Sequence, residues 1–316
     1  MKKTYHISSN GLQESTSDHD VLEIYLNPSE KERKQFIRDH NFPEDLFDFD
    51  DMPHIAPRIE IFHKEEINHT LFFVFSNVFD TSEDSQVEKR FESHTFILKQ
   101  EKLFWFMNNK SSTLDQELLE EKGIKINSVQ SILLNAVLLS YRRFTEELEK
   151  QKEVIDELNK QAIRSTSRQI LIEVSDTERN LVMLQHTIET QEEAVTKLLD
   201  HEEFIEKLNN PHLVHDVKWY NRQVKKLINV YRDLLDSVSS LFSDIMSNNL
   251  NKLMKFLSSL SLIIASSSLI GDLWGMNTGG LPFEQSEYGT LIMIGVTLLA
   301  GIMMYLFLKN KEYFDD

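Results

Sequence analysis

Short runs of β-branched and aromatic residues alternate with polar turns over residues 1–110. They predict five β-strands at Val21–Leu26, Arg58–Phe62, Thr70–Ser76, Thr95–Lys99 and Leu103–Met107. Asn27-Pro28-Ser29 supplies a capping residue and an early proline before the helix-forming run Glu30–His40, and a second short helix is predicted over Pro43–Phe47. Strands mixed with helices and short turns are typical of an α/β or α+β domain.

From about Asn127 the pattern becomes helical. Ser128–Asn159 has apolar residues at spacings of three and four without Gly or Pro, and the pattern returns in the Glu-rich segment Gln169–Leu208. Asn209-Asn210-Pro211 interrupts it. Because neither Pro nor Gly occurs again before Gly271, the chain predicts one helix of about 60 residues, roughly 90 Å long. Such a helix needs neighbours along its sides, either the acidic hairpin upstream or further copies of the chain.

Two stretches near the C-terminus carry no charge. Phe256–Gly271 has 16 residues and Gly289–Leu308 has 20, and about 20 apolar residues cross a bilayer as a helix. The first stretch reaches that length if Leu253–Trp274 is helical and Lys255 extends toward the interface. We therefore predict membrane spans at about 253–274 and 289–308. A buried hairpin of core helices is the alternative, but a chain that is 41% hydrophobic has little else to surround it.

Charges beside the spans predict their orientation. The loop 275–288 contains Glu284 and Glu287 but no Lys or Arg, whereas Lys252, Lys255, Lys309 and Lys311 flank the spans. By the positive-inside rule, the loop is external and both flanks are cytoplasmic. The N-terminus lacks a signal-peptide apolar block and is also expected in the cytoplasm. The predicted organisation of this cell-membrane protein is a cytoplasmic α/β domain (1–125), long helices and a stalk (126–250), a transmembrane domain (251–308) and a cytoplasmic tail (309–316).

Composition excludes several classes of protein. The chain has 34 Lys and Arg against 51 Asp and Glu, a net charge of −17, which argues against nucleic-acid binding. The absence of cysteine excludes disulfides, thiolate metal sites and thiol nucleophiles. The sequence contains no phosphate-binding glycine loop, G-x-S-x-G or H-E-x-x-H motif. We therefore expect neither an enzyme nor a resident cofactor.

A stripe of small and polar residues follows the first span. Two membrane helices cannot enclose a pore, so a transporting chain must assemble as several copies around an axis. Spacings of three and four, the repeat of helices that wind around a common axis, connect Asn251, Met254, Ser258, Ser261, Ala265, Ser268 and Asp272. The stripe either lines a pore or packs closely against another helix. Ser259, Ser266 and Ser267 lie off it.

Acidic residues cluster near the predicted outer end of the first span. A carboxylate within a span is costly in lipid. Asp272 therefore either lies solvated in the interface beside Trp274 or joins a ring of carboxylates that concentrates cations at the outer mouth. Glu284 and Glu287 either strengthen this field or simply keep the loop soluble.

Gly275-Met276-Asn277, directly after the first span, resembles the signature of the CorA family of divalent-cation transporters. Asn251-Lys252-Leu253-Met254-Lys255 resembles the family's N-x-[VL]-M-K segment, Tyr231-Arg232-Asp233 an aromatic-Arg-Asp step on its stalk helix, and Ser128–Asn159 the helix after its α/β domain. The resemblance implies a homopentamer with a cytoplasmic funnel, in which five stalk helices continue into the pore.

The resemblance also assigns roles to individual residues. It implies that Asn277, with the backbone carbonyls of Gly275 and Met276, forms a selectivity filter that holds a hydrated cation. That suits Mg²⁺, which gives up its water reluctantly. Asn251 and Met254 would lie near the cytoplasmic constriction. Asp216 matches a stalk carboxylate that binds regulatory Mg²⁺ between subunits in some members; simple solvent exposure is the alternative.

Four features depart from the family pattern. Asp272 stands where many members have a small residue, Ser266 replaces a common proline, Ser240 replaces a frequent acid, and the tail KNKEYFDD lacks a lysine run. These departures leave the gating and the ion open.

Oxygen donors favour Mg²⁺, with Co²⁺ or Ni²⁺ tolerated, because residues 216–316 contain no His or Cys. We interpret the 11 histidines as ordinary surface or core residues; the alternative for His212 and His215, which are spaced i, i+3, is that they bind metal with Asp216. A proton-coupled Zn²⁺ transporter of the same superfamily and a membrane-anchored coiled-coil scaffold without transport are the alternatives.

Overall fold

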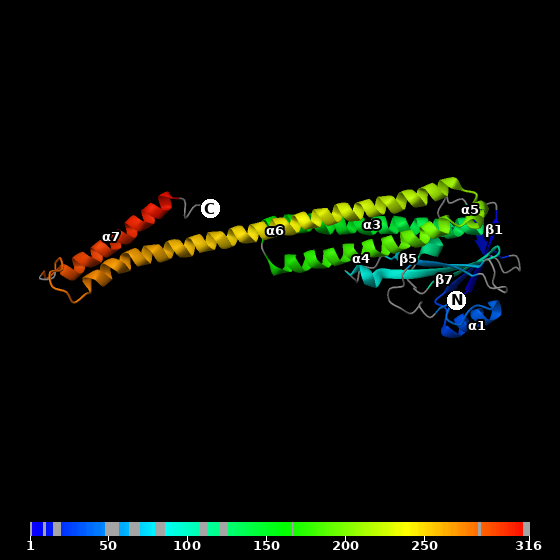
Figure 1. Ribbon diagram of the computed structural model, residues 1–316, viewed down its shortest axis with the longest axis horizontal. Helices are drawn as coiled ribbons and strands as arrows, with labels where there is room; N and C mark the ends of the chain where they lie inside the picture. The colour runs from blue at the N-terminus through cyan, green and yellow to red at the C-terminus, as the bar shows by residue number, and fades with distance from the viewer. Residues whose placement is uncertain are drawn as a thin grey trace. The chain divides into compact units, whose positions relative to one another are not determined.

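The computed structural model describes residues 2–8, 11–14, 20–47, 57–62, 70–79, 86–107, 113–120, 126–165, 167–283 and 286–311. The chain forms two compact units, Met1–Ser239 and Ser240–Asp316. Figure 1 shows the order of their helices and strands. The finer four-part division of the chain stays a prediction.

A seven-stranded mixed sheet lies in the first unit. Its order is β2-β1-β3-β7-β6-β5-β4, with β3 and β7 parallel and the other pairs antiparallel. The strands are β1 (Lys2–Ser8), β2 (Gly11–Glu14), β3 (Leu22–Leu26), β4 (Arg58–Phe62), β5 (Thr70–Val78), β6 (Phe91–Lys99) and β7 (Lys102–Met107). The five predicted strands and the mixed α/β class are confirmed. β1 and β2 were missed, because Tyr5 is the only described residue of either strand that is fully buried.

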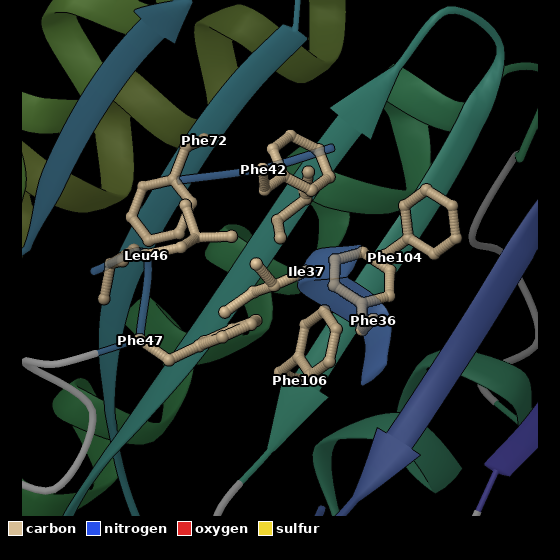
Figure 2. Close-up of a cluster of buried hydrophobic side chains, with 10 residues drawn as sticks. Phe36, Ile37, Phe42, Leu46, Phe47, Phe72, Phe104 and Phe106 are labelled. Atoms are coloured by element: carbon tan, nitrogen blue, oxygen red, sulfur yellow. The ribbon is translucent and has the colours of Figure 1, made fainter. Parts of the chain in front are cut away.

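Helix α1 (Glu30–His40) covers one face of the sheet (Figure 1). Ser29 caps it: its hydroxyl accepts from the Glu32 N–H at 3.3 Å, and the Glu32 carboxylate accepts from the Ser29 N–H at 2.7 Å. Figure 2 shows its side chains meeting those of the sheet in one apolar cluster, which comprises Phe36, Ile37, Phe42, Leu46, Phe47, Phe72, Val74, Ile97, Phe104 and Phe106. This cluster is the core on the α1 side.

The predicted short helix over Pro43–Phe47 is wrong. The segment is a turn in which the Leu46 N–H donates to the Pro43 carbonyl at 3.2 Å. A single hydrogen bond does not compensate for the cost of nucleating a helix. The turn instead brings Leu46 and Phe47 into the apolar cluster.

Helices α3 (Val129–Arg164) and α4 (Arg168–Leu199) pack on the other side of the sheet (Figure 1). Both bind the backbone of Ser76 on β5: the Ser140 hydroxyl donates to its carbonyl at 2.8 Å, and its N–H donates to Gln191 Oε1 at 3.0 Å. These buried contacts give each helix a defined position against β5.

A buried ion pair connects the short 3₁₀ helix before β6 to α3. Arg90, at the end of the short 3₁₀ helix Val87–Arg90, donates to both carboxylate oxygens of Glu147, at 2.5 and 2.8 Å. Gln151 donates to the same carboxylate at 2.8 Å. Charge is tolerated in this core because the partners satisfy one another.

The predicted helix Gln169–Leu208 is broken at Asp200 and His201. Its end forms α5 (Glu202–Leu208), where His201 Nδ1 accepts from the Phe204 N–H at 3.3 Å. The interruption predicted at Asn209-Asn210-Pro211 is confirmed: Asn209 is left-handed with φ 44°, and Asn210 Oδ1 accepts from the Leu213 N–H at 3.2 Å.

Three further helices complete the described chain. α2 (Leu114–Glu120) was not predicted. α6 (Pro211–Trp274) is a single helix of 64 residues, as the absence of Pro and Gly predicts, and α7 (Gly289–Asn310) is a helix of 22 residues. Both predicted spans are therefore helical.

Candidate functional site: the apolar helices and their connecting loop

Helices α6 and α7 are each long and apolar enough to cross a membrane. Within the most apolar 18-residue window of each, only 6% and 11% of the residues are buried by the rest of the described chain. A core hairpin of a soluble protein would be mostly buried. The low burial therefore favours lipid or further protein as the surroundings of both helices.

One face of α6 packs against α7. A Cβ placed on Gly301 would lie 2.7 Å from Ser267 Oγ and 3.9 Å from Ile263 Cγ2, so the two helices approach closely at this glycine. Ser259 and Leu308 are also buried, at 0% and 4% exposure. Small residues at such a contact allow close packing of membrane helices.

Two of the serines off the stripe make hydrogen bonds inside α6. Ser259 donates to the Lys255 carbonyl at 2.7 Å, and Ser266 donates to the Ile263 carbonyl at 2.9 Å. These hydroxyls are therefore satisfied by the helix itself. Ser267 lies at the α7 contact.

The predicted stripe lies away from this contact. All seven of its residues are exposed: Asn251, Met254, Ser258, Ser261, Ala265, Ser268 and Asp272. At about 100° of rotation per residue, the stripe falls on roughly the opposite side of α6 from Ser259, Ile263 and Ser267. Packing against α7 therefore does not explain the stripe, which leaves lipid, water or another copy of the chain to face it.

The tripeptide Gly275-Met276-Asn277 begins the loop after α6. The Gly275 N–H makes the last helical hydrogen bond, to the Gly271 carbonyl at 2.9 Å. A Cβ on Gly275 would lie 3.2 Å from that oxygen, so a side chain here would be crowded. Met276 and Asn277 are exposed, and the Met276 carbonyl accepts from the Thr278 N–H at 2.9 Å.

A hydrogen bond closes the loop that carries this tripeptide. Trp274 Nε1 donates to the Pro282 carbonyl at 3.0 Å and so connects the end of α6 to the far side of the loop. This role of Trp274 was not predicted. An indole directly before the tripeptide and a proline eight residues later were the available signal.

A tight turn leads from the loop into α7. Phe283 has a φ of 66°, and a Cβ on Gly289 would lie 2.4 Å from the Phe283 carbonyl oxygen, so only glycine fits at 289. Glu287 is exposed. Glu284 lies outside the described residues.

Asp216 lies on the exposed surface of α6. Its carboxylate is 3.5 Å from His215 Nδ1, and the two side chains are 56% and 70% exposed. Over the described ranges, no group of three or more His, Cys, Asp or Glu side chains is placed to hold a metal. His212, His215 and Asp216 thus do not form such a group within one chain.

A mixed-sheet unit, the long helix α6 with its apolar second half, and the apolar helix α7 together fit a membrane protein. The sequence model for the "CorA-like Mg2+ transporter protein" family matches residues 25–310. The chain therefore belongs to this family of ion transporters, which are not enzymes, and the predicted resemblance is confirmed.

Relatives and solved structures agree with this assignment. The cobalt/magnesium transport protein CorA of Thermotoga maritima is 21% identical over 265 residues, which cover 82% of this chain and 73% of that protein. The complete structure of the CorA magnesium transporter from Methanocaldococcus jannaschii has a TM-score of 0.77 at 14% identity and covers 98% of this chain and 96% of that one.

A second solved structure bears on the choice of ion. The cytoplasmic domain of ZntB from Vibrio parahaemolyticus has a TM-score of 0.59 at 15% identity and covers 78% of this chain and 96% of that one. At these identities the likeness concerns the fold alone. The fold is therefore shared by proteins of different names and does not select the ion.

Proposed function

We propose that copies of this chain, five in number by the resemblance to its family, surround a common axis and conduct hydrated divalent cations, Mg²⁺ above all. The observation that carries the proposal is the pair of opposite faces on α6. One face is occupied by α7, while the face with Asn251, Ser258 and Ser261 is exposed along its length. Polar side chains without a partner in the bilayer need water or protein, and a central aqueous pore supplies it.

Asn277 provides the outer selectivity site in this proposal. It lies in the loop closed by Trp274 and Pro282, so its amide is attached to a constrained backbone. A ring of such amides offers neutral oxygens to the water shell of a cation without removing that shell, which suits Mg²⁺. Co²⁺ and Ni²⁺ would be tolerated through their similar hydrated forms. Asp272 and Glu287, both exposed, add negative charge that attracts cations to the same end.

In this proposal, cytoplasmic divalent ions regulate the channel by binding at Asp216. Its carboxylate is exposed on α6. The described residues of one chain do not complete a metal site around it, so neighbouring copies would contribute the remaining oxygen ligands. Loss of the bound ion at low cytoplasmic Mg²⁺ would then favour opening.

The test is cation flux into liposomes that contain the purified protein. Mg²⁺ should enter, and Asn277→Ala should reduce entry by about tenfold or more, since the loss of about 1.4 kcal/mol of stabilisation changes a rate tenfold. Thr278→Ala, a change in the same loop, should leave flux and oligomer size unchanged. Equal flux in both variants would reject the role of Asn277.

The same assay separates the alternatives. Flux of Zn²⁺ that exceeds flux of Mg²⁺ and requires a pH gradient would favour a zinc transporter. An intact oligomer that passes none of Mg²⁺, Co²⁺, Ni²⁺ or Zn²⁺ would favour a scaffold without transport.

A further inference from the structure

The end of the α3–α4 hairpin exposes large apolar side chains. Ile163, on the last turn of α3, is 64% exposed, more than any other large apolar residue described in the first unit. Leu171 and Ile172, on the first turn of α4, are 44% and 45% exposed. These exposed side chains at the end of the hairpin do not pack against the sheet, and together they indicate a surface available to a partner.

The same hairpin end carries a local positive charge. Residues 158–172 contain Lys160, Arg164 and Arg168 but no Asp or Glu, although the chain has a net charge of −17. All three basic side chains are exposed, and Lys160 Nζ lies 3.5 Å from a carboxylate oxygen of Glu157. Acidic residues resume immediately on both sides, at Glu157 and Glu173. Arg164 and Arg168 therefore carry most of the positive charge of the segment that exposes the apolar residues.

Contacts within the first unit give the direction of the hairpin. Lys225 on α6 binds Glu192 on α4 at 2.5 Å, and Arg232, further along α6, binds Gln185 at 2.5 Å. The two helices are therefore antiparallel. The Arg168 end of α4 lies in the direction in which α6 continues toward Ser239.

The basic and apolar residues lie far along the hairpin from its contact with α6. From the Arg232–Gln185 contact, 17 residues of α4 lead to Arg168, about 25 Å. Lys160, Ile163, Arg164, Arg168, Leu171 and Ile172 form an exposed surface there, which we call the hairpin end.

We propose that the hairpin end docks on the anionic cytoplasmic surface of the bilayer that holds the chain. Basic side chains around exposed Ile and Leu residues match the chemistry of a membrane interface, where apolar groups enter the acyl boundary and basic groups meet lipid phosphates. The proposal rests on the predicted cytoplasmic orientation of the first unit and is independent of ion transport. Docking would attach the cytoplasmic unit to lipid at a second point besides α6.

The test uses the absence of native cysteine. Ser165→Cys, at the exposed C-cap of α3, carries an environment-sensitive fluorophore in the full-length protein. Ser175→Cys is the matched control, because it is also an exposed serine but lies within the acidic part of α4. Both proteins are placed in nanodiscs of neutral phosphatidylcholine, with or without about 30 mol% phosphatidylserine.

The Ser165 label should shift to the blue and become at least about twofold less accessible to aqueous iodide in the anionic discs only. The change should shrink by half or more at 1 M salt, where the Debye length is about 3 Å. It should disappear when Lys160, Arg164 and Arg168 are all replaced by Gln.

Equal exposure of the Ser165 and Ser175 labels in anionic discs would overturn the proposal. Shielding of the Ser165 label to the same degree in neutral discs and in detergent would overturn it as well, since protein and not lipid then covers the label. Flux measured on the same discs or liposomes is a separate readout, so failure of docking and failure of transport are distinguishable.

Discussion

The two units of the chain differ in which polar and apolar side chains they bury. In the first unit, the buried side chains of Arg90 and Glu147 pair with each other, and large aromatic residues such as Trp105 and Phe73 are buried. In the second unit, most leucines and isoleucines are exposed, and so are Asn251, Ser261 and Asp272. The first unit thus buries most of its large apolar side chains itself, whereas the second leaves most of its own exposed, together with a stripe of polar residues.

The same contrast divides the serines of α6. Ser259 and Ser267 face α7 or lie buried, whereas Ser258, Ser261 and Ser268 are exposed on roughly the opposite side. The same residue type therefore occurs on both faces. Position relative to α7 separates residues that hold the two helices together from residues available to a pore.

Breaking the buried ion pair tests whether internal contacts stabilise the first unit. It should have the largest effect on stability. Glu147→Ala leaves the Arg90 guanidinium, 6% exposed, without its carboxylate. Such a loss costs about 3–5 kcal/mol of stability. Thermal unfolding of the full-length protein in detergent should show a clear drop in the melting temperature. The double variant Arg90→Met with Glu147→Leu should recover most of it, and an unaffected single variant would contradict the account.

Overpacking the α6–α7 contact tests the second unit. Gly301→Leu would force a side chain against Ser267 and Ile263, and overpacking typically costs about 1–3 kcal/mol. We expect partial loss of the folded oligomer in size-exclusion chromatography, together with reduced flux. Gly295→Leu is the control, because no heavy atom lies within 4 Å of a Cβ built at Gly295. Equal tolerance of both changes would argue against this contact.

The proposed regulatory role of Asp216 predicts a change in sensitivity to Mg²⁺. In liposomes, the Mg²⁺ concentration on the cytoplasmic side that halves flux should rise severalfold in Asp216→Ala, by about 1 kcal/mol in coupling. Asp236→Ala, another exposed acid on α6, should leave it unchanged. If the Mg²⁺ concentration that halves flux is unchanged in Asp216→Ala, then Asp216 is a simple solvated residue without a regulatory role.

The smallest expected effect concerns a carboxylate in the first unit and its dependence on pH. Burial raises the pKa of Glu23, but hydrogen bonds from Lys102, Lys2 and Tyr25 outweigh burial and lower it overall. A lowered pKa in the folded state means that the stabilisation is present above the ordinary value of about 4.3 and is lost as the pH falls through the lowered pKa.

Glu23→Gln should therefore cost about 1 kcal/mol or less at pH 7, because Lys2 and Lys102 are partly exposed. The difference from the natural protein should shrink as the pH falls below about 4.3, in denaturant unfolding followed by tryptophan fluorescence. Glu60→Gln, an exposed glutamate on β4, should show a smaller effect. A difference for Glu23→Gln that grows on acidification would contradict the assigned direction.

Much of the fold was predictable because its elements have strong local signals. The capping sequence before α1, the five apolar strands and the long interval without Gly or Pro in α6 each predict their element without tertiary information. β1 and β2 lack such a signal, since neighbouring strands and not their own apolar residues stabilise them. The break at Asp200 and His201 is likewise local to a cap that no Gly or Pro marks.

Sequence patterns name the residues of the candidate site, which stay predictions, but they do not give the surroundings of those residues. The tripeptide 275–277 and the spacing of the stripe can be recognised in the sequence alone. The face of α6 that meets α7, and the hydrogen bond from Trp274 to Pro282, depend on how two separate segments approach in space. A periodic pattern shows that a face exists, but it does not show what covers that face.

The most direct measurement compares cysteines at two adjacent positions of α6. Ser261 lies on the stripe, while Leu260 is exposed at about the same depth but rotated by about 100°. In reconstituted protein, a water-soluble thiol reagent should block Mg²⁺ flux through Ser261→Cys and leave Leu260→Cys unmodified and active. Modification of Leu260→Cys with Ser261→Cys unreactive would mean that the stripe faces lipid, and the proposed pore would be wrong.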